Sequence, residues 1–230
     1  MPLETKIKAV IFDMFETLVS LFIGRTYFGE DIGADAGVDP EAFRKVWQES
    51  EHDRTVGKMT VEEGIAKGLE TFGINSPDLV KTIASHRLDN LKDTFDNTPD
   101  DSEKLLQELH KRGIKIGLIT NTFSDERDMI RASKLFKYFD ATRISYEQGV
   151  CKPDPSMYNS IMEEFGVKPE ECLYVGDGGS RELFVARELG MNPVQATWFH
   201  HLAFEPHIPC PLLPDEFPQG KNQLDILDYI

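Results

Sequence analysis

Residues 7–18 read Ile-Lys-Ala-Val-Ile-Phe-Asp-Met-Phe-Glu-Thr-Leu. The apolar run that opens this stretch predicts a buried strand, which delivers Asp13 to a loop with Thr17 four residues later. Open α/β sheets bind their ligands beyond the carboxyl ends of the strands, so Asp13 stands where a site would form. A lone aspartate at such a point more often caps a loop, and the stretch therefore needs partners elsewhere in the chain.

Three further motifs supply such partners. They are Thr120-Asn121 after residues 115–119, Lys152-Pro153, and Gly176-Asp177 after residues 173–175. Together with Asp13, these motifs provide two carboxylates, a hydroxyl group and a lysine, mostly at the ends of apolar strands. Metal-assisted attack on a phosphoryl group requires this set of groups, and the series in this order is far more specific than any one motif.

The rest of the chain predicts a doubly wound, Rossmann-like parallel α/β sheet with an inserted helical domain. Strand-like runs alternate with helical stretches, which favours parallel strands joined by crossover helices. Between residues 20 and 96 the strand signals disappear, and capping motifs such as Thr60-Val61-Glu62-Glu63 mark four or five helices. The expected strands are 7–12, 114–119, 141–145, 172–176 and 192–196. The expected helices include 40–51, 102–111, 156–165, 180–189 and a short one near 222–229.

Composition narrows the class of protein. The chain has 230 residues, of which 40% are hydrophobic, and its formal net charge is −15. This charge argues against a nucleic-acid partner or an anionic membrane surface. No run of about 18 apolar residues occurs, so no membrane span is expected. The three cysteines (Cys151, Cys172 and Cys210) are widely spaced, so we expect free thiols in a reducing, cytoplasmic compartment. The protein is expected to be a monomer or a homodimer.

The four motifs in this order resemble those of the haloacid dehalogenase (HAD) superfamily of hydrolases. The resemblance covers nearly the whole chain and implies an α/β core of residues 1–19 and 97–230, with a helical cap domain of residues 20–96 inserted after the first motif. It also implies a Mg²⁺-dependent phosphatase that acts on a small phosphorylated metabolite. Asp13 would attack phosphorus and form an aspartyl-phosphate that water then hydrolyses.

The same resemblance implies how the substrate is held. Thr120 is expected to bind a phosphate oxygen through its hydroxyl group, with Asn121 beside it and Thr17 as a further substrate contact. Lys152 is expected to neutralise both Asp13 and the transferring group as a point charge. Each of these short motifs alone would be ordinary turn chemistry, so their roles depend on their positions in the series.

The resemblance also implies a metal site. Asp177 would hold Mg²⁺ together with Asp13 and the backbone carbonyl of Phe15, a sparse oxygen set of the kind that Mg²⁺ accepts. Glu182 takes the place of a second acidic residue that contacts a metal-bound water. A first-turn glutamate favoured by the helix dipole explains Glu182 equally well.

Phe15 departs from the pattern of HAD phosphatases, which carry a second aspartate there to protonate the leaving group. A phenyl ring cannot do this, and general acid–base catalysis contributes on the order of 10²–10⁴ in rate. One explanation is a substrate with a good leaving group, or an acid supplied by another residue; the adjacent Glu16 is expected to point away. Alternatively, the protein is a 2-haloacid dehalogenase, because halide needs no proton, or a weakly active or non-catalytic binder of a phosphorylated ligand.

The dehalogenase alternative conflicts with one motif. Dehalogenases use no metal and replace the Gly-Asp of the last motif, whereas Gly176-Asp177 is intact here. Tyr158 matches a dehalogenase tyrosine, but an aromatic core residue is equally usual at that place. A fourth alternative, phosphonoacetaldehyde-type cleavage, would need Lys58 as a Schiff-base amine.

Two further groups of residues receive weak interpretations. The segment with His200, His201, His207 and Cys210 contains zinc-binding residue types, but their spacing matches no usual zinc site. Arg25 and Arg54 are candidate contacts for a carboxylate or a second phosphate on the substrate. Arginines paired with acids on the protein surface are the simpler interpretation of both.

Overall fold

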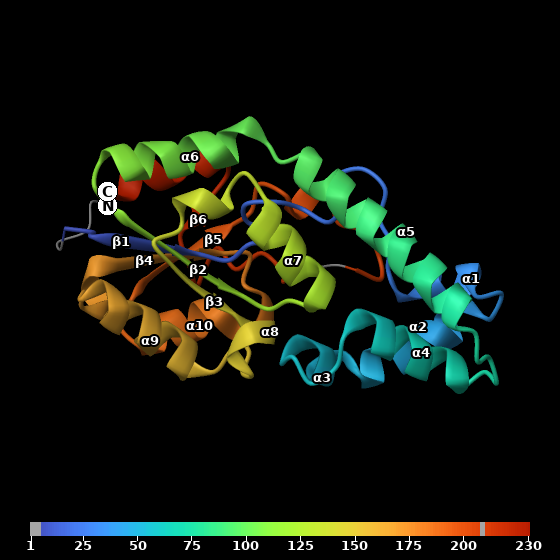
Figure 1. Ribbon diagram of the computed structural model, residues 1–230. Coiled ribbons are helices and arrows are strands. Elements are labelled where there is room, and N and C mark those ends of the chain that lie inside the picture. Colours follow the sequence, from blue (N-terminus) through green and yellow to red (C-terminus); the bar gives the residue numbers. More distant parts are fainter. Residues whose placement is uncertain (1–5, 208–209) are drawn as a thin grey trace.

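The computed structural model describes residues 6–207 and 210–230. Six parallel strands form one sheet in the order β3-β2-β1-β4-β5-β6 (Figure 1). The five strands expected from the sequence are confirmed to within two residues at either end, whereas β6 carries no apolar run and was not expected. The strands are β1 (Ala9–Phe12), β2 (Lys115–Thr120), β3 (Ala141–Ile144), β4 (Cys172–Gly176), β5 (Asn192–Ala196) and β6 (Gln219–Gly220).

Helices cover both faces of the sheet. Successive residues of β1 point to opposite faces, so Val10 and Phe12 join one buried cluster while Ala9 and Ile11 join another. The first cluster packs under α6 (Asp100–Lys111) and α7 (Ser124–Ala132), and the second packs under α9 (Pro155–Phe165) and α10 (Glu182–Glu188). A parallel sheet buried on both faces is the doubly wound arrangement that the sequence predicts.

Five helices form the inserted segment. They are α1 (Gly29–Asp35), α2 (Pro40–Glu49), α3 (Glu51–Thr55), α4 (Val61–Glu70) and α5 (Pro77–Asp96). These helices enclose an apolar cluster of their own, built around Phe43, Trp47 and Ile65. Figure 1 shows α1–α4 beyond one end of the sheet, while the long α5 runs back toward the core.

Three helices differ from the sequence-based expectation. The helix expected over 40–51 is two helices, because Ser50 leaves the helical region with φ −99° and ψ 6°. The helix expected at 180–189 begins at Glu182, because Ser180 and Arg181 adopt left-handed backbone angles. The last helix, Gln223–Tyr229, is a 3₁₀-helix capped by Asn222.

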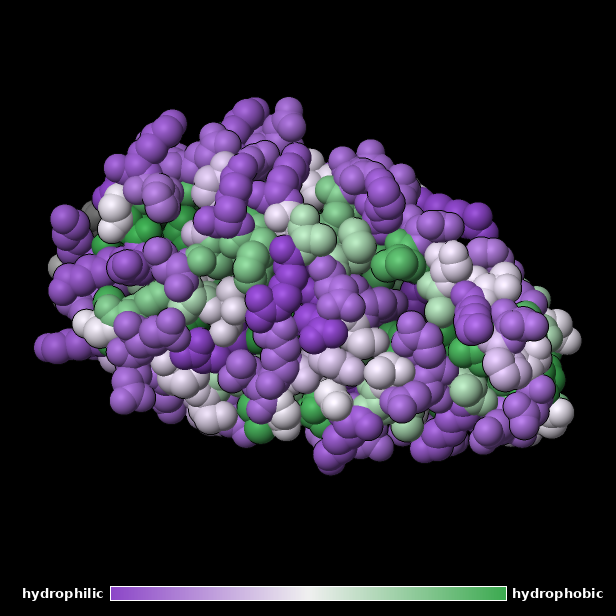
Figure 2. All heavy atoms as spheres, in the orientation of Figure 1, coloured by the Kyte–Doolittle hydropathy of each residue, from purple (hydrophilic) through white to green (hydrophobic). Residues whose placement is uncertain are grey.

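Hydrophilic residues dominate the face shown in Figure 2, with apolar patches between them, as the many charged residues lead one to expect. None of the helices in the described ranges is long and apolar enough to cross a membrane.

Candidate active site

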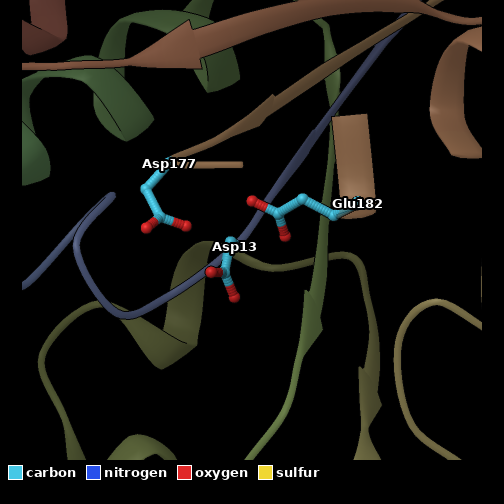
Figure 3. A group of neighbouring side chains, drawn as sticks. All are labelled: Asp13, Asp177 and Glu182. Carbon is cyan, nitrogen blue, oxygen red and sulfur yellow. The ribbon is translucent and has the colours of Figure 1, made fainter. Parts of the chain in front are cut away.

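The carboxyl ends of β1 and β4 bring Asp13 and Asp177 together. The Asp13 amide donates a hydrogen bond of 2.9 Å to the Val175 carbonyl, which extends the pairing of β1 with β4 by one residue. Asp177 follows the last residue of β4. Figure 3 shows the carboxylates of Asp13, Asp177 and Glu182 converging, and one oxygen of each lies within 4.8 Å of the others.

Lys152 lies within the same cluster. Its Nζ is 2.8 Å from Oδ1 of Asp13 and 2.5 Å from Oε2 of Glu182, and its side chain is only 4% exposed. Burial lowers the pKa of Lys152, but the negative charges of Asp13 and Glu182 outweigh this effect and raise the pKa above its usual value. Lys152 is therefore protonated at neutral pH and neutralises charge at the position expected for it.

Asn121 fixes the backbone of Lys152. The Asn121 side-chain carbonyl accepts a 2.8 Å hydrogen bond from the Lys152 amide, and its side-chain amide donates to the Lys152 carbonyl at 3.2 Å. The same amide also donates to the Ser180 hydroxyl at 3.3 Å. The side chain of Asn121 is thus engaged in joining three loops, a positioning role that the sequence did not reveal.

Glu182 is completely buried, and both of its carboxylate oxygens accept hydrogen bonds. Oε2 accepts from Lys152 and from the Tyr174 hydroxyl at 2.8 Å, while Oε1 accepts from the Gly178 amide at 3.0 Å. A Cβ atom at Gly176 would lie 2.0 Å from Oε1, so only glycine leaves room for this carboxylate. These contacts favour Glu182 as the residue that positions Lys152.

The charges of the cluster favour a divalent cation. Three carboxylates and one ammonium group leave a net charge of −2 when all are ionised. Burial raises the pKa of Asp177, and the negative charge of Asp13 adds to the effect. Within the described residues, no hydrogen bond uses the Phe15 carbonyl. The carboxylates of Asp13 and Asp177 therefore fit a hard cation that prefers oxygen ligands, whereas both oxygens of Glu182 already accept hydrogen bonds.

Two threonine hydroxyl groups at the site lack partners. Thr17 and Thr120 are both fully buried, and Oγ1 of each has no hydrogen-bond partner in the part of the chain that the structure describes. An unpaired buried hydroxyl group is unfavourable, typically by about 1–3 kcal/mol. Neither hydroxyl group is thus used by the fold itself among the described residues.

Phe15 and Glu16 face different surroundings. The Phe15 ring packs edge-to-face on Phe95, with 6.2 Å between the centroids, and lines a large cavity. Glu16, whose backbone is left-handed with φ 55°, does not line this cavity: its carboxylate accepts hydrogen bonds from the Ser20 hydroxyl and the Leu21 amide and shares a small pocket with Asp177. Burial raises the pKa of Glu16 to about 7. Neither residue supplies an acid to the large cavity.

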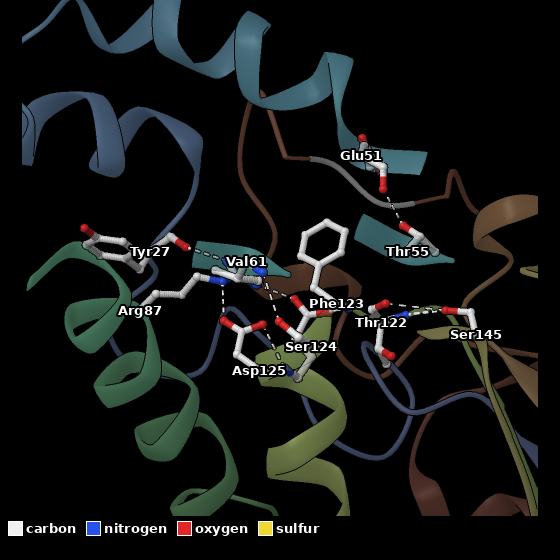
Figure 4. Close-up of polar contacts among 11 residues, drawn as sticks. Tyr27, Glu51, Thr55, Val61, Arg87, Thr122, Phe123, Ser124, Asp125 and Ser145 are labelled. Carbon is white, nitrogen blue, oxygen red and sulfur yellow. Dashed lines mark hydrogen bonds and ion pairs between the residues drawn. The ribbon is translucent and has the colours of Figure 1, made fainter. Parts of the chain in front are cut away.

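This cavity, of about 450 Å³, lies between the inserted helices and the site. Its wall includes Phe15, Trp47, Arg54, Asn90, Asn121 and Thr122. Polar contacts join the inserted helices to the core near this cavity, as Figure 4 shows: Arg87 of α5 pairs with Asp125 of α7, and the Val61 amide donates to the Ser124 hydroxyl at 3.0 Å. The inserted helices and the core thus line a partly open space of metabolite size.

Several alternatives from the sequence find no support. Lys58 is two-thirds exposed, lies 3.9 Å from Asp53 and is not part of the cavity wall, so it is no candidate Schiff-base amine. Tyr158 is fully buried against Tyr174, as a core residue would be.

The zinc interpretation of the C-terminal segment also lacks support. Among the described residues, Asp13, Asp177 and Glu182 form the sole group of three metal-ligating side chains within reach of one another, so His200, His201 and Cys210 form none. His207 instead stacks on Phe28 and lies 2.5 Å from Glu30.

Comparison with known proteins establishes the family. Residues 7–190 match the family of haloacid dehalogenase-like hydrolases, and the chain belongs to this family. It is therefore an enzyme of the hydrolase class. The resemblance seen in the sequence motifs is confirmed.

Among individual relatives, a phosphatase of Mycobacterium tuberculosis is 28% identical over 181 residues, which are 74% of this chain and 79% of that protein. A phosphoserine phosphatase of Thermus thermophilus is 35% identical over 99 residues, or 43% of this chain and 39% of that protein. The rhythmically expressed gene 2 protein of Drosophila melanogaster is 37% identical over 93 residues, or 39% and 36%. The chain thus matches less than half of the length of the last two proteins.

Solved structures share the fold. A 2-haloacid dehalogenase from Pseudomonas syringae aligns with a TM-score of 0.67 at 20% identity, over 97% of both chains. A HAD family enzyme from Bacteroides thetaiotaomicron aligns with a TM-score of 0.64, also at 20% identity, over 87% of this chain and all of that one. At this identity the similarity concerns the α/β sheet with its added helices.

Proposed function

We propose that the protein is a Mg²⁺-dependent phosphatase that acts on a small phosphorylated metabolite through an aspartyl-phosphate on Asp13. The observation that carries this proposal is the retained carboxylate of Asp177 opposite Asp13, in a cluster where three carboxyl groups face a single ammonium group and a divalent cation would balance the excess negative charge. Phosphatases among the relatives support the same reaction class. We also propose that residues 20–96 act as a cap over a core of residues 1–19 and 97–230.

In this proposal, Asp13 attacks phosphorus and the leaving alkoxide departs on the opposite side. Lys152 stabilises the negative charge that accumulates on the transferring group, while Glu182 and Asn121 hold Lys152 in place. The hydroxyl groups of Thr17 and Thr120 donate to phosphate oxygens. When bound by Asp13, Asp177 and the Phe15 carbonyl, Mg²⁺ would supply further stabilisation of negative charge on those oxygens.

Phe15 sets the expected substrate preference. Without a carboxyl group at this position, the leaving oxygen must depart with little help from a protein acid, so esters of acidic alcohols should react fastest. The aromatic ring also contributes an apolar wall to the cavity beside the reacting group.

A 2-haloacid dehalogenase is the second candidate, and Phe15 is the observation that favours it. Halide departs without a proton, so the missing acid would be no disadvantage. Asp177 opposes this candidate, because displacement of halide by Asp13 needs no metal carboxylate. A binder of a phosphorylated ligand with little turnover is the third possibility, and it predicts tight binding without product.

We further propose a cytoplasmic location and a monomer or homodimer. Cys151, Cys172 and Cys210 are all free, which suits a reducing compartment.

Phosphate release tests the proposed function. A panel of phosphorylated metabolites and p-nitrophenyl phosphate would be assayed with Mg²⁺ and with EDTA, beside halide release from 2-haloacids. We expect phosphate release that EDTA abolishes. Metal-independent halide release would instead support the dehalogenase, and silence in both assays with measurable phosphate-ester binding would support the non-catalytic binder.

A further inference from the structure

Arg54, on α3, is a completely buried arginine in the wall of the large cavity. Its guanidinium carbon lies 3.4 Å from the centroid of the Trp47 ring and 4.6 Å from that of the Phe123 ring. Its Nη1 donates to the Trp47 carbonyl at 2.8 Å and to the Ser50 hydroxyl. The side chain is thus fixed in one orientation, between an aromatic residue of the inserted helices and one of the core.

Arg54 forms no ion pair in the part of the chain that the structure describes, and the acids nearest to it (Glu51, Asp125 and Glu126) only partly offset the effect of its burial. Its Nε is buried without any hydrogen-bond partner there. Burial lowers the pKa of Arg54 to about 10, and the positive charge of Arg87 adds to the effect. The guanidinium is nevertheless protonated at neutral pH, so a buried cation stands unpaired, which is unfavourable in the absence of a ligand.

Arg87 lines the same cavity and provides the contrast. Its side chain is 7% exposed, its Nε lies 2.6 Å from Oδ2 of Asp125, and its Nη2 lies 2.5 Å from Oε1 of Glu126. In Figure 4, Arg87 points from α5 toward Asp125. One buried arginine of the cavity wall therefore pairs with two carboxylates, whereas Arg54 pairs with none in the described residues.

Two neutral side chains of the cavity wall also lack partners. Asn90 Nδ2 and Thr122 Oγ1 are buried without a hydrogen bond in the described residues. Of the three acids on the wall, Glu126 pairs with Arg87 and Glu30 pairs with His207, while Glu51 lies near enough to affect the pKa of Arg54 but forms no ion pair with it in the described residues. The wall therefore offers a cation and two hydrogen-bonding groups to an acceptor that the protein itself does not supply.

We propose that this wall, formed by Arg54, Asn90 and Thr122, is a binding subsite for a carboxylate that the substrate carries in addition to its phosphoryl group. The inference rests on the proposed function, in which the phosphoryl group sits at Asp13. A planar carboxylate matches the edge of a guanidinium group, and the attraction between the two charges is strongest where water is excluded. The substrate class is thus a phosphorylated carboxylic acid.

Substrate pairs that differ only in this charge test the proposal. Phosphoglycolate would be compared with its neutral amide, and 4-carboxyphenyl phosphate with 4-carbamoylphenyl phosphate, by kcat/KM with Mg²⁺. We expect the wild-type protein to prefer the acid of at least one pair by about tenfold or more, since a charge-assisted hydrogen bond contributes on this scale. Arg54→Met should abolish the preference through a higher KM for the acid, with little change for the amide.

Two further variants and a control sharpen the test. Arg54→Lys keeps the charge without the planar edge and should lose part of the preference, and Thr122→Val should weaken binding of the acid without disturbing the Trp47 stack. Arg44→Met is the control, because Arg44 also lines the cavity but pairs with Glu41. Thermal unfolding of each variant would identify any that fail to fold.

Calorimetric binding of both esters to Asp13→Asn, with and without Arg54→Met, separates this proposal from the proposed function. An Arg54-dependent preference for the acid would support the subsite even if no ester were hydrolysed. Equal binding of acid and amide, or an equal loss of both in Arg54→Met, would overturn the subsite even if phosphate were released rapidly.

Discussion

Buried charges are stabilised differently in the charged cluster at the sheet and in the wall of the cavity beside the inserted helices. In the cluster, Lys152 lies between Asp13 and Glu182, and each carboxylate oxygen of Glu182 has a donor. In the cavity wall, Arg54 is equally buried but forms no ion pair within the described residues. The cluster thus keeps its geometry through contacts within the protein, whereas the cavity wall retains polar groups without partners in the described residues, which a ligand could bind.

The largest expected effect concerns the cluster. Asp13→Asn keeps the shape of the side chain but removes the nucleophile, so turnover of p-nitrophenyl phosphate should fall by on the order of 10⁴-fold or more. Steady-state kinetics with Mg²⁺ would measure the loss, and a circular dichroism melt would verify that the variant folds. A fully active Asp13→Asn protein would contradict the assignment of the nucleophile.

Phe15→Asp changes a residue that follows Asp13 by two positions and lines the cavity. The introduced carboxyl group would restore an acid and base beside the reacting group, and we expect the rate on alkyl phosphates to rise by about 10²–10⁴-fold. The gain should be smaller for p-nitrophenyl phosphate, whose leaving group needs no proton. An equal gain for both esters would show that Phe15 acts through its bulk alone.

Arg87→Met should break the connection between the inserted helices and the core. It would leave the carboxylates of Asp125 and Glu126 buried without their cation, and removal of one partner of a buried pair lowers the free energy of unfolding by about 3–5 kcal/mol. Urea unfolding would measure this loss. Lys92→Met is the matched control on α5, because Lys92 and Asp96 are exposed and their pair should contribute nothing measurable.

Glu182→Gln tests whether Glu182 positions Lys152 or binds the metal ion. If Glu182 positions Lys152, kcat should fall by about 10–100-fold while the Mg²⁺ concentration needed for half-maximal activity stays unchanged. A large increase in that concentration, with little change in kcat at saturating Mg²⁺, would instead make Glu182 a metal ligand.

The proximity of Asp13 and Asp177 was predictable from the sequence, because strand ends carry positional information. Asp13 and Asp177 each follow an apolar strand, and parallel neighbours bring such residues to one edge. The role of Glu182 was not predictable, because it depends on the clearance at Gly176 and on the left-handed residues Ser180 and Arg181.

The cavity wall was much less predictable. The sequence offers Arg54 as a candidate substrate contact, but a surface ion pair is the simpler interpretation of it from the sequence alone. Only the packing of α2 against α3 buries the guanidinium under Trp47, and only the position of Phe123 closes its other side. Asn90 and Thr122 come from separate elements and carry no motif that would mark them as neighbours of one cavity.

The oxygen atom of the hydrolytic water gives the most direct test of hydrolysis through an aspartyl-phosphate on Asp13. A single turnover in oxygen-18 water would be quenched, and both the released product and the peptide that contains Asp13 would be examined by mass spectrometry. In the phosphatase, water attacks phosphorus, so the label should appear in phosphate and not in Asp13. If a 2-haloacid released halide and the label appeared in the Asp13 carboxylate, the result would contradict the phosphatase mechanism and establish a dehalogenase.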